Sequence, residues 1–263
     1  LPARVKGYRR DWLDQATLSG ELAWMRLWGA ASSPARRTPI CFVRRDDLSV
    51  WSAMAAPLPL PEPTGSAQQV VDALREKGAL FFSELARAAR LPPAYLEAAL
   101  GELVAQGRLT CDSYAGLRYL IVPAWRKQVG SAVGGRWSLL EREKGTAPAD
   151  DLAAFAARQL LRRTGVVFRK TVMRERLPIP WRDVARACRL LEARGEIRGG
   201  RFVQGFDGEQ YALPEAITLL RTVRRTEAGP AVMVYASDPL NLRGILTPEE
   251  RVPAQAREKV AVG

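Results

Sequence analysis

The chain has 263 residues, which is enough for two or three small domains that each bury a core. Its 40 Lys and Arg residues against 28 Asp and Glu residues give a net charge of +12. This excess favours an anionic polymer or surface as partner, with a basic surface that serves only solubility as the alternative. The sequence contains no His, which excludes Ser-His-Asp and Cys-His nucleophiles and imidazole ligation of zinc within it.

Other absences narrow the class further. No apolar run reaches 18 residues, so no transmembrane helix and no membrane partner are predicted. Cys41, Cys111 and Cys188 are far apart and odd in number, which indicates reduced cysteines in a cytoplasmic protein. There is no CxxC pair and no P-loop motif, so no metal site is predicted and any P-loop lies outside this chain. Because the sequence starts at Leu1, we read it as a fragment of a longer protein.

Residues 1–56 are expected to form an α/β, strand-rich segment. A short helix is predicted over 8–15, followed by apolar strands over 21–28 and 39–45. Asp46 or Asp47 can then cap a helix. Residues 57–65 hold four prolines and a glycine, which predicts a stiff linker and a domain boundary.

Residues 66–122 are predicted to form a first winged helix. Helices are expected over 66–77 and 82–91, and a third helix starts after Pro92 and ends before Gly107. The stretch RLTCD-SYAG-LRYLIV is expected to form the wing hairpin. Six basic and six acidic residues cancel within 66–122, so an architectural or protein-contact role is favoured for this copy. Residues 123–150 are expected to be a connector in which RWSLL forms a short strand or turn.

Residues 151–213 repeat the same pattern and are predicted to form a second winged helix. A helix over 151–164 leads into VVFRKTVMRERL, and Pro180 opens a further helix that ends near residue 194. A hairpin punctuated by glycines follows, and three helices before a two-stranded wing are typical of a winged helix. Residues 214–263 are expected to form a helix, a buried strand over 231–236 and an irregular tail, which could pair with the strands of residues 21–45.

Basic residues concentrate in this second copy. Between Arg158 and Arg201 there are 13 Lys and Arg residues against 4 Asp and Glu residues. Arg182, Arg186 and Arg189 share one face of the helix after Pro180, apart from its apolar stripe. Guanidinium groups bind phosphates and the edge of guanine through paired hydrogen bonds. An ordinary solvated face is the alternative, but the charge density favours DNA contact by Arg162, Arg163, Arg169, Lys170, Arg174, Arg182, Arg186, Arg189, Arg198 and Arg201.

Three polar residues are candidates for catalysis. Asp238 directly follows a predicted strand, which places its carboxylate well for general-base work and equally well for a turn or a helix cap. Glu209 and Gln210 follow the predicted wing turn and could contact a base edge or orient a water molecule. Exposed loop residues without a catalytic role are the alternative for both.

Several stretches resemble the C-terminal region of bacterial large helicase-related (Lhr) proteins: RVKGYRRDWLDQATLSGELAWMRLW, GRWSLL, RRTGVVF, PWRDVARACRLLEARGEIRGGRFVQGFDGEQYALPEA and SDPLNLRGILTPEERVPA. The resemblance implies an α+β fold with tandem winged-helix domains and flanking strands that form a β-barrel-like module. It is similar to the AlkZ type of DNA glycosylase, although the glutamine-rich catalytic motif of that type has no clear counterpart here. The resemblance also implies an upstream helicase core that uses ATP and Mg.

We therefore expect a DNA-binding module that acts in DNA repair and holds single-stranded or tailed DNA for an upstream ATP-dependent 3′-to-5′ helicase core. No cofactor is expected in this chain itself. A first alternative is a DNA glycosylase that excises uracil or a damaged base, and a second is a protein-interaction scaffold. The upstream helicase core is an expected partner, and a second copy of the chain, in a homo-oligomer, is a further candidate. The expected location is the cytoplasm, in association with the nucleoid.

Overall fold

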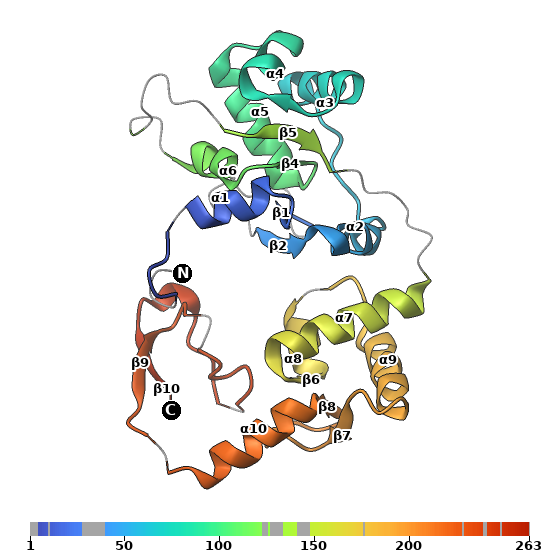
Figure 1. The fold of residues 1–263 in the computed structure, drawn as a ribbon, viewed down its shortest axis with the longest axis vertical. Coiled ribbons are helices and arrows are strands. Elements are labelled where there is room, and N and C mark those ends of the chain that lie inside the picture. Colours follow the sequence, from blue (N-terminus) through green and yellow to red (C-terminus); the bar gives the residue numbers. More distant parts are fainter. Residues whose placement is uncertain are drawn as a thin grey trace. The chain divides into compact units, whose positions relative to one another are not determined.

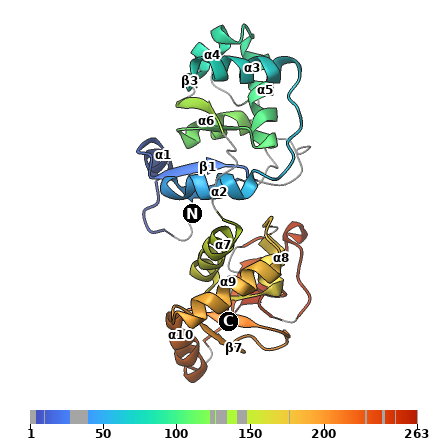
Figure 2. The ribbon, with the colours of Figure 1, turned by 90° about the vertical axis from the view of Figure 1, so that its right-hand side faces the viewer.

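The computed structural model describes residues 5–9, 11–27, 40–122, 126, 134–140, 148–175, 177–227, 229–238, 241–247 and 249–262. The chain divides into two compact units, Leu1–Thr146 and Ala147–Gly263, and both are mixed helix and strand (Figure 1; Figure 2). Most of the predicted connector, residues 123–125, 127–133 and 141–147, lies outside the described residues.

The first unit begins with a helix and a two-stranded sheet. Strand β1 pairs antiparallel with β2, and Trp24 lies opposite Phe42. The predicted strands and both predicted short helices are confirmed, although Asp47 makes no side-chain cap to the helix that follows it. The elements are α1 (Asp11–Leu18), β1 (Leu22–Met25), β2 (Cys41–Arg44), the 3-10 helix η2 (Arg45–Asp47) and α2 (Leu48–Ala55).

A bundle of three helices and a three-stranded sheet follow in the first unit. The strand order is β3-β5-β4. Strand β3, which follows the first of these helices, therefore pairs with β5, the last strand of the wing. The three predicted helices are confirmed, and Gly107 ends the third in a left-handed conformation. The elements are α3 (Gly65–Lys77), β3 (Leu80–Phe81), α4 (Phe82–Ala88), α5 (Pro93–Gln106), β4 (Leu109–Cys111) and β5 (Arg136–Leu139).

The prediction for the first wing is wrong in its second half. The stretch LRYLIV belongs to helix α6 (Tyr114–Ile121), and the strand that pairs with β4 is β5, drawn from the segment predicted as connector. The hydroxyl of Ser113 accepts a hydrogen bond from the Ala115 amide at 3.2 Å and so caps the helix. Gly116 lets α6 lie close to the sheet, because a Cβ there would come within 2.8 Å of the Cys111 sulfur.

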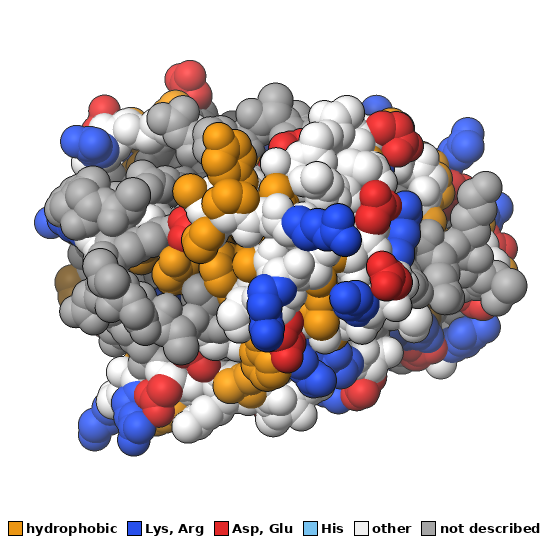
Figure 3. All heavy atoms as spheres, turned by 90° about the horizontal axis from the view of Figure 1, so that it is seen from above, with side chains coloured by type: hydrophobic (Ala, Val, Ile, Leu, Met, Phe, Trp, Pro, Cys, Tyr) orange, Lys and Arg blue, Asp and Glu red, His pale blue; other side chains and the backbone are white. Residues whose placement is uncertain are grey.

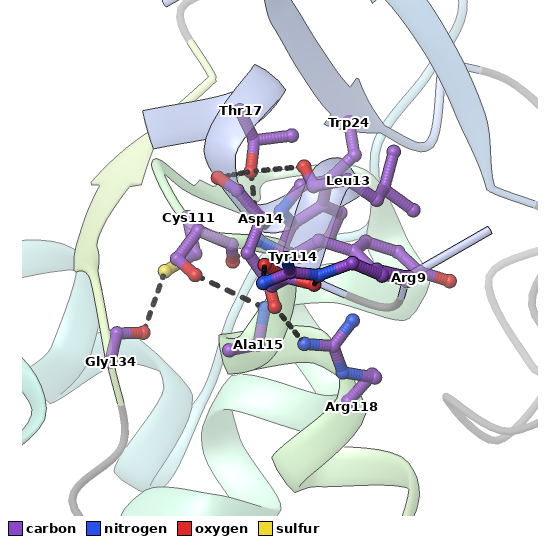
Figure 4. A network of polar contacts seen from close by, with 12 residues as sticks. Arg9, Leu13, Asp14, Thr17, Trp24, Cys111, Tyr114, Ala115, Arg118 and Gly134 are labelled. Carbon is purple, nitrogen blue, oxygen red and sulfur yellow. Dashed lines mark hydrogen bonds and ion pairs between the residues drawn. The ribbon is translucent and has the colours of Figure 1, made fainter. Parts of the chain in front are cut away.

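The N-terminal segment packs onto the wing and α6 of the same unit (Figure 4). The Thr17 hydroxyl accepts a hydrogen bond from the Tyr114 amide at 3.1 Å, and Asp14 forms an ion pair with Arg118. The fully buried Trp24 donates its indole N–H to the Ser113 carbonyl at 3.2 Å. The Pro-rich stretch 57–65 therefore joins two parts of one compact unit, and the Pro61 carbonyl accepts a 2.6 Å hydrogen bond from Arg108.

The second unit contains the same succession of elements. Helices α7, α8 and α9 precede a hairpin, and the strand order β6-β8-β7 matches the order of the three-stranded sheet in the first unit. The predicted helices and hairpin are confirmed with small shifts of their ends. The elements are α7 (Ala149–Thr164), β6 (Val166–Phe168), α8 (Arg169–Glu175), α9 (Trp181–Ala193), β7 (Arg198–Gly200) and β8 (Gln210–Ala212).

The C-terminal segment holds α10 (Pro214–Arg225), β9 (Val232–Tyr235), the 3-10 helix η4 (Ala254–Ala256) and β10 (Lys259–Val262). The expectation of a buried strand at 231–236 is wrong, because Val232, Met233 and Tyr235 are more than half exposed. Among the described strands, β9 pairs with β10 and β1 with β2 in separate sheets, and none close into a barrel. A β-barrel-like module therefore stays a prediction.

We expect Trp24→Ala to lower the free energy of unfolding of the first unit by about 3–5 kcal/mol, because it removes a large, fully buried side chain. Trp12→Ala is the matched control, since Trp12 is 41 % exposed and its loss should cost less than about 1 kcal/mol. Urea unfolding followed by circular dichroism measures both. Equal losses in the two variants would contradict the packing of the N-terminal segment against α6 and the wing.

Candidate nucleic-acid interface

Helix α9 has two distinct faces. Val184, Cys188 and Leu191 are buried and pack against α7, in one apolar cluster with Ala157 and Leu161. These α9 positions recur at the spacing of an amphipathic helix. Burial of this stripe fixes how the helix is rotated, and the remaining face is turned to solvent.

The solvent face of α9 carries the predicted arginine stripe. The side chains of Arg182, Arg186 and Arg189 are 85 %, 53 % and 57 % exposed. Their spacing of four and then three residues brings them onto one side of the helix. The structure therefore confirms that the stripe is exposed and lies apart from the core.

Each arginine of the stripe lies within ion-pair distance of a carboxylate. Arg189 makes two hydrogen bonds to Glu209 of the wing, at 2.8 and 3.0 Å. Arg186 pairs with Asp150 at the start of α7, and Arg182 lies 3.7 Å from Asp183. Such exposed pairs contribute little to stability because water and salt screen them, so a phosphate can displace the carboxylates at little cost.

The Arg189 hydrogen bonds hold the pKa of Glu209 below its ordinary value. Glu209 is therefore a carboxylate at neutral pH and cannot serve there as a proton donor. For the neighbouring Cys188 and Tyr211 the pKa changes in the opposite direction, because burial raises both values to about 12. Cys188 is a protonated thiol of the core and is not a nucleophile at neutral pH.

The wing extends the basic surface from the end of α9. The Glu192 carboxylate accepts a 2.8 Å hydrogen bond from the Gly199 amide and so ties β7 to the helix. Gly199 is required for this approach, since a Cβ would lie 2.8 Å from the Glu192 oxygen. Arg198 is exposed on β7, and the Arg201 guanidinium lies 3.9 Å from Asp207.

The remaining predicted DNA contacts lie on other helices. Arg162 and Arg163 are exposed in the last turn of α7, where Arg163 pairs with Glu175 at 2.6 Å. Arg169, Lys170 and Arg174 lie on α8 and line a cavity with residues of the wing and the C-terminal segment. Nine of the ten predicted residues thus lie on four elements, α7, α8, α9 and β7, and Arg201 directly follows β7.

Gln210 is a structural residue of the wing. Its side chain is 1 % exposed, and its amide oxygen accepts hydrogen bonds from the Phe202 and Val203 amides, both at 2.8 Å. Its amide nitrogen donates to the carbonyls of Val203 and Phe206 at 2.9 and 3.1 Å. These four bonds use the hydrogen-bonding capacity of the side chain and shape the loop that carries Phe206.

Asp238 lies in the turn directly after β9. Its amide donates to the Tyr235 carbonyl at 2.8 Å, and its own carbonyl accepts from the Asn241 amide at 2.9 Å. The buried Asn241 donates its side-chain amide to the Ala236 carbonyl at 3.1 Å and so braces the turn. Asp238 is thus placed on a different element from Glu209 and Gln210.

The corresponding surface of the first unit has no comparable stripe. On α5, Glu97 accepts a hydrogen bond from the Tyr119 hydroxyl at 2.5 Å, and Glu102 accepts one from Gln106 at 2.9 Å. Viewed from the α3 and α4 end of the molecule, basic and acidic side chains are interspersed beside a band of hydrophobic ones (Figure 3). Among the described residues there is also no group of acidic or cysteine side chains that could hold a metal ion.

Comparison with known proteins agrees with this division. Residues 146–232, which run from α7 to the start of β9, match a family model described as the winged-helix domain of the large helicase-related protein. Over these residues the chain is similar to the large helicase-related (Lhr) family. An Escherichia coli relative named "Lhr helicase/uracil glycosylase" is 27 % identical over 97 % of the chain. A Mycolicibacterium smegmatis relative named "Lhr helicase/ probable uracil glycosylase" is 26 % identical over 93 % of it.

The resemblance seen in the sequence is therefore confirmed, and the second unit contains a winged helix of a helicase-related protein. The chain spans about a fifth of the length of these relatives, 18 % in each case. Within the described part of the chain, no helix has the length and apolar character needed to cross a membrane.

Sequence reasoning missed two features of the second unit. Phe206 and Arg251 join the α8 cations around the cavity, and Gln210 holds the wing together instead of facing solvent. No local sequence pattern predicts either feature, because both depend on contacts that form only in the folded chain.

We expect Glu209→Gln to bind single-stranded DNA about 2- to 5-fold more tightly than the wild type, because it removes the carboxylate that competes with phosphate for Arg189. Glu227→Gln removes the same charge from the exposed segment after α10 and is the matched control. Fluorescence anisotropy with a labelled oligonucleotide at fixed salt measures both. An equal gain in the two variants would show that only net charge matters.

Proposed function

We propose that this chain is a DNA-binding module of an Lhr-type, ATP-dependent DNA helicase and that it holds single-stranded or tailed DNA for an upstream translocase. The observation that carries the proposal is the exposed Arg182, Arg186 and Arg189 stripe on α9, beside the basic strand β7. In winged helices the helix at this position is the one that enters a groove of the nucleic acid. The helicase-related winged-helix match over 146–232 supports the same assignment.

The ion pairs of the stripe suggest how DNA is accepted. In the free protein the carboxylates of Asp150, Asp183 and Glu209 hold the guanidiniums in place. When a DNA strand arrives, its phosphates replace these carboxylates, and the release of counterions from the DNA drives the exchange. Binding by this route is strongly dependent on salt.

The first unit has an architectural role in this proposal. Its helix order and its β3-β5-β4 sheet parallel the second unit, so we regard the two as tandem winged helices of unequal function. The neutral balance of residues 66–122 and the acidic side chains Glu97 and Glu102 on α5 argue against a phosphate grip. A protein contact, with the helicase core or another copy of the chain, suits this surface better.

The rest of the protein supplies the motor in this scheme. The relatives are named helicases and are about five times longer than this chain. We infer that ATP and Mg act in a core outside this sequence, where they would drive 3′-to-5′ translocation. A protein of this kind would act in DNA repair on the nucleoid, in the cytoplasm.

We expect the triple variant Arg182→Ala, Arg186→Ala, Arg189→Ala to lose about 10- to 100-fold in affinity for single-stranded DNA at low salt, because three phosphate contacts are removed. With about five phosphates contacted, log K of the wild type for single-stranded DNA should fall with log salt at a slope of about −3.5, and the variant slope should be shallower by about 2. Anisotropy titrations at several salt concentrations measure both quantities.

The matched control is the triple variant Arg75→Ala, Lys77→Ala, Arg87→Ala in the first unit, which removes the same charge from exposed positions. Its affinity should stay within about threefold of the wild type, with a nearly unchanged salt slope. A flat salt response of the wild type, or equal losses in the two triple variants, would sink the proposal.

A second candidate function is base excision, favoured by the names of the relatives, which include uracil glycosylase as an activity or a probable one. A glycosylase without a nucleophile needs a carboxylate or amide to position water against the sugar. Asp238 is the first candidate for this role, because its carboxylate directly follows strand β9, a position suited to general-base work. Glu209 and Gln210 are the second candidates.

If the chain excises uracil, incubation with uracil-containing single-stranded DNA followed by alkali should break the strand. Asp238→Asn should then reduce the rate by at least about 100-fold, as expected for loss of a catalytic base. Asp151→Asn, at an exposed position on α7, should not change the rate. Absence of strand breaks with the wild type would leave the binding function alone, and full activity of Asp238→Asn would remove Asp238 from the role.

A further inference from the structure

A cavity of about 480 Å³ lies in the second unit, outside the α9 stripe. Its walls come from α8, from the loop between β7 and β8, and from Gly244, Ile245 and Arg251 of the C-terminal segment. The volume falls within the range of about 300–1,000 Å³ that is usual for small-molecule sites. Its basic and larger apolar lining residues are Arg169, Lys170, Arg174, Arg251, Met173 and Phe206.

The cations of this cavity differ from those of α9 in their partners. Within the described part of the chain, no carboxylate lies within 4 Å of the charged nitrogens of Arg169, Lys170, Arg174 or Arg251, whereas every arginine of the α9 stripe has one. Asp207 is the one acidic residue of the lining, and its fully exposed side chain lies 3.9 Å from Arg201. Four cations that face one hollow without counter-ions form a site for an anion.

An aromatic ring stands among these cations. Phe206 is half-buried and packs on the buried Phe168, with ring centroids 4.7 Å apart and planes tilted by 35°. The Lys170 ammonium lies 4.8 Å from the centroid of the Phe206 ring. A cation in this position is attracted to the face of the ring. The flexible side chain of Lys170 lets the ammonium move to a phosphate when a planar group takes its place over the ring.

The third wall depends on one glycine. Gly244 has φ +69°, and a Cβ there would lie 2.6 Å from the backbone N and Cα of Arg251. The Gly244 amide donates to the Thr247 hydroxyl at 2.8 Å, and Glu249 pairs with Arg243 at 3.4 Å. The chain thus folds back tightly enough to bring Arg251 to the cavity, while the nearby carboxylate is held by a different arginine.

We propose that this cavity binds a single unpaired nucleotide of a DNA strand, with the base against Phe206 and the adjoining phosphates among the four cations. The proposal rests on the proposed DNA-binding function and adds to it a site that recognises a base. Aromatic stacking is tolerant of base identity, because every base presents a π face, and stacking requires that the base be unpaired. The site therefore distinguishes single-stranded from duplex DNA, which the phosphate contacts of α9 do not.

The test compares two labelled oligonucleotides of equal length and phosphate number, one of thymidines and one of abasic tetrahydrofuran units. With the whole chain, Phe206→Leu should weaken binding of the thymidine strand by about 5- to 100-fold and change binding of the abasic strand by less than about twofold. Leucine keeps an apolar contact with Phe168 while it removes the ring. Phe206→Tyr keeps the ring and should restore wild-type binding, and thermal unfolding checks that all variants fold.

A further variant separates the charge of the cavity from its ring. Arg174→Ala should weaken both strands to a similar extent, because both carry phosphates. Millimolar thymidine monophosphate should fail to displace the thymidine strand, since a free nucleotide lacks the neighbouring phosphates.

Equal affinities of Phe206→Leu and wild type for the thymidine strand would overturn the site. A loss of equal size on the abasic strand would overturn it too, as would displacement by the free nucleotide. Failure of the wild type to bind either strand would instead refute the proposed DNA-binding function, so the two failures are distinguishable.

Discussion

The burial of the apolar stripe of α9 against α7 is the constraint on which the second unit depends. A helix with 3.6 residues per turn that commits Val184, Cys188 and Leu191 to the core has no freedom to rotate. Arg182, Arg186 and Arg189 are then turned to solvent together. The wing is tied to the same helix through Glu192, so its basic strand β7 follows the orientation that the core imposes.

The basic charge of this unit is organised in two ways. Along α9, carboxylates from α7 and the wing pair with Arg186 and Arg189, and in the proposed function phosphates replace them. Around the cavity on α8, the cations have no such partners among the described residues and lie around an aromatic ring. The first arrangement suits contact with any DNA backbone, and the second suits an unpaired base with its phosphates. Together they would let the module grip a strand and recognise that it is single.

The sequence predicted the exposed arginine stripe and, apart from α6, the helices of both units, because periodicity and charge are local signals. The first wing was mispredicted, because its second strand, β5, lies some 24 residues after β4 and the apolar stretch between them suits helix and strand equally. The roles of Gln210 and Phe206 depend on tertiary contacts that no local pattern encodes. The cavity needs Arg251 brought beside α8 by the turn at Gly244, which only the folded chain shows.

The central claim is that the second unit grips DNA through α9 and β7 while α5 of the first unit does not. Hydrogen exchange of the whole chain, measured by mass spectrometry with and without a saturating thymidine oligonucleotide, tests it most directly. Our account predicts slower exchange in peptides that cover 181–201 and unchanged exchange in those that cover 93–106. Protection of 93–106 with no change in 181–201 would contradict it.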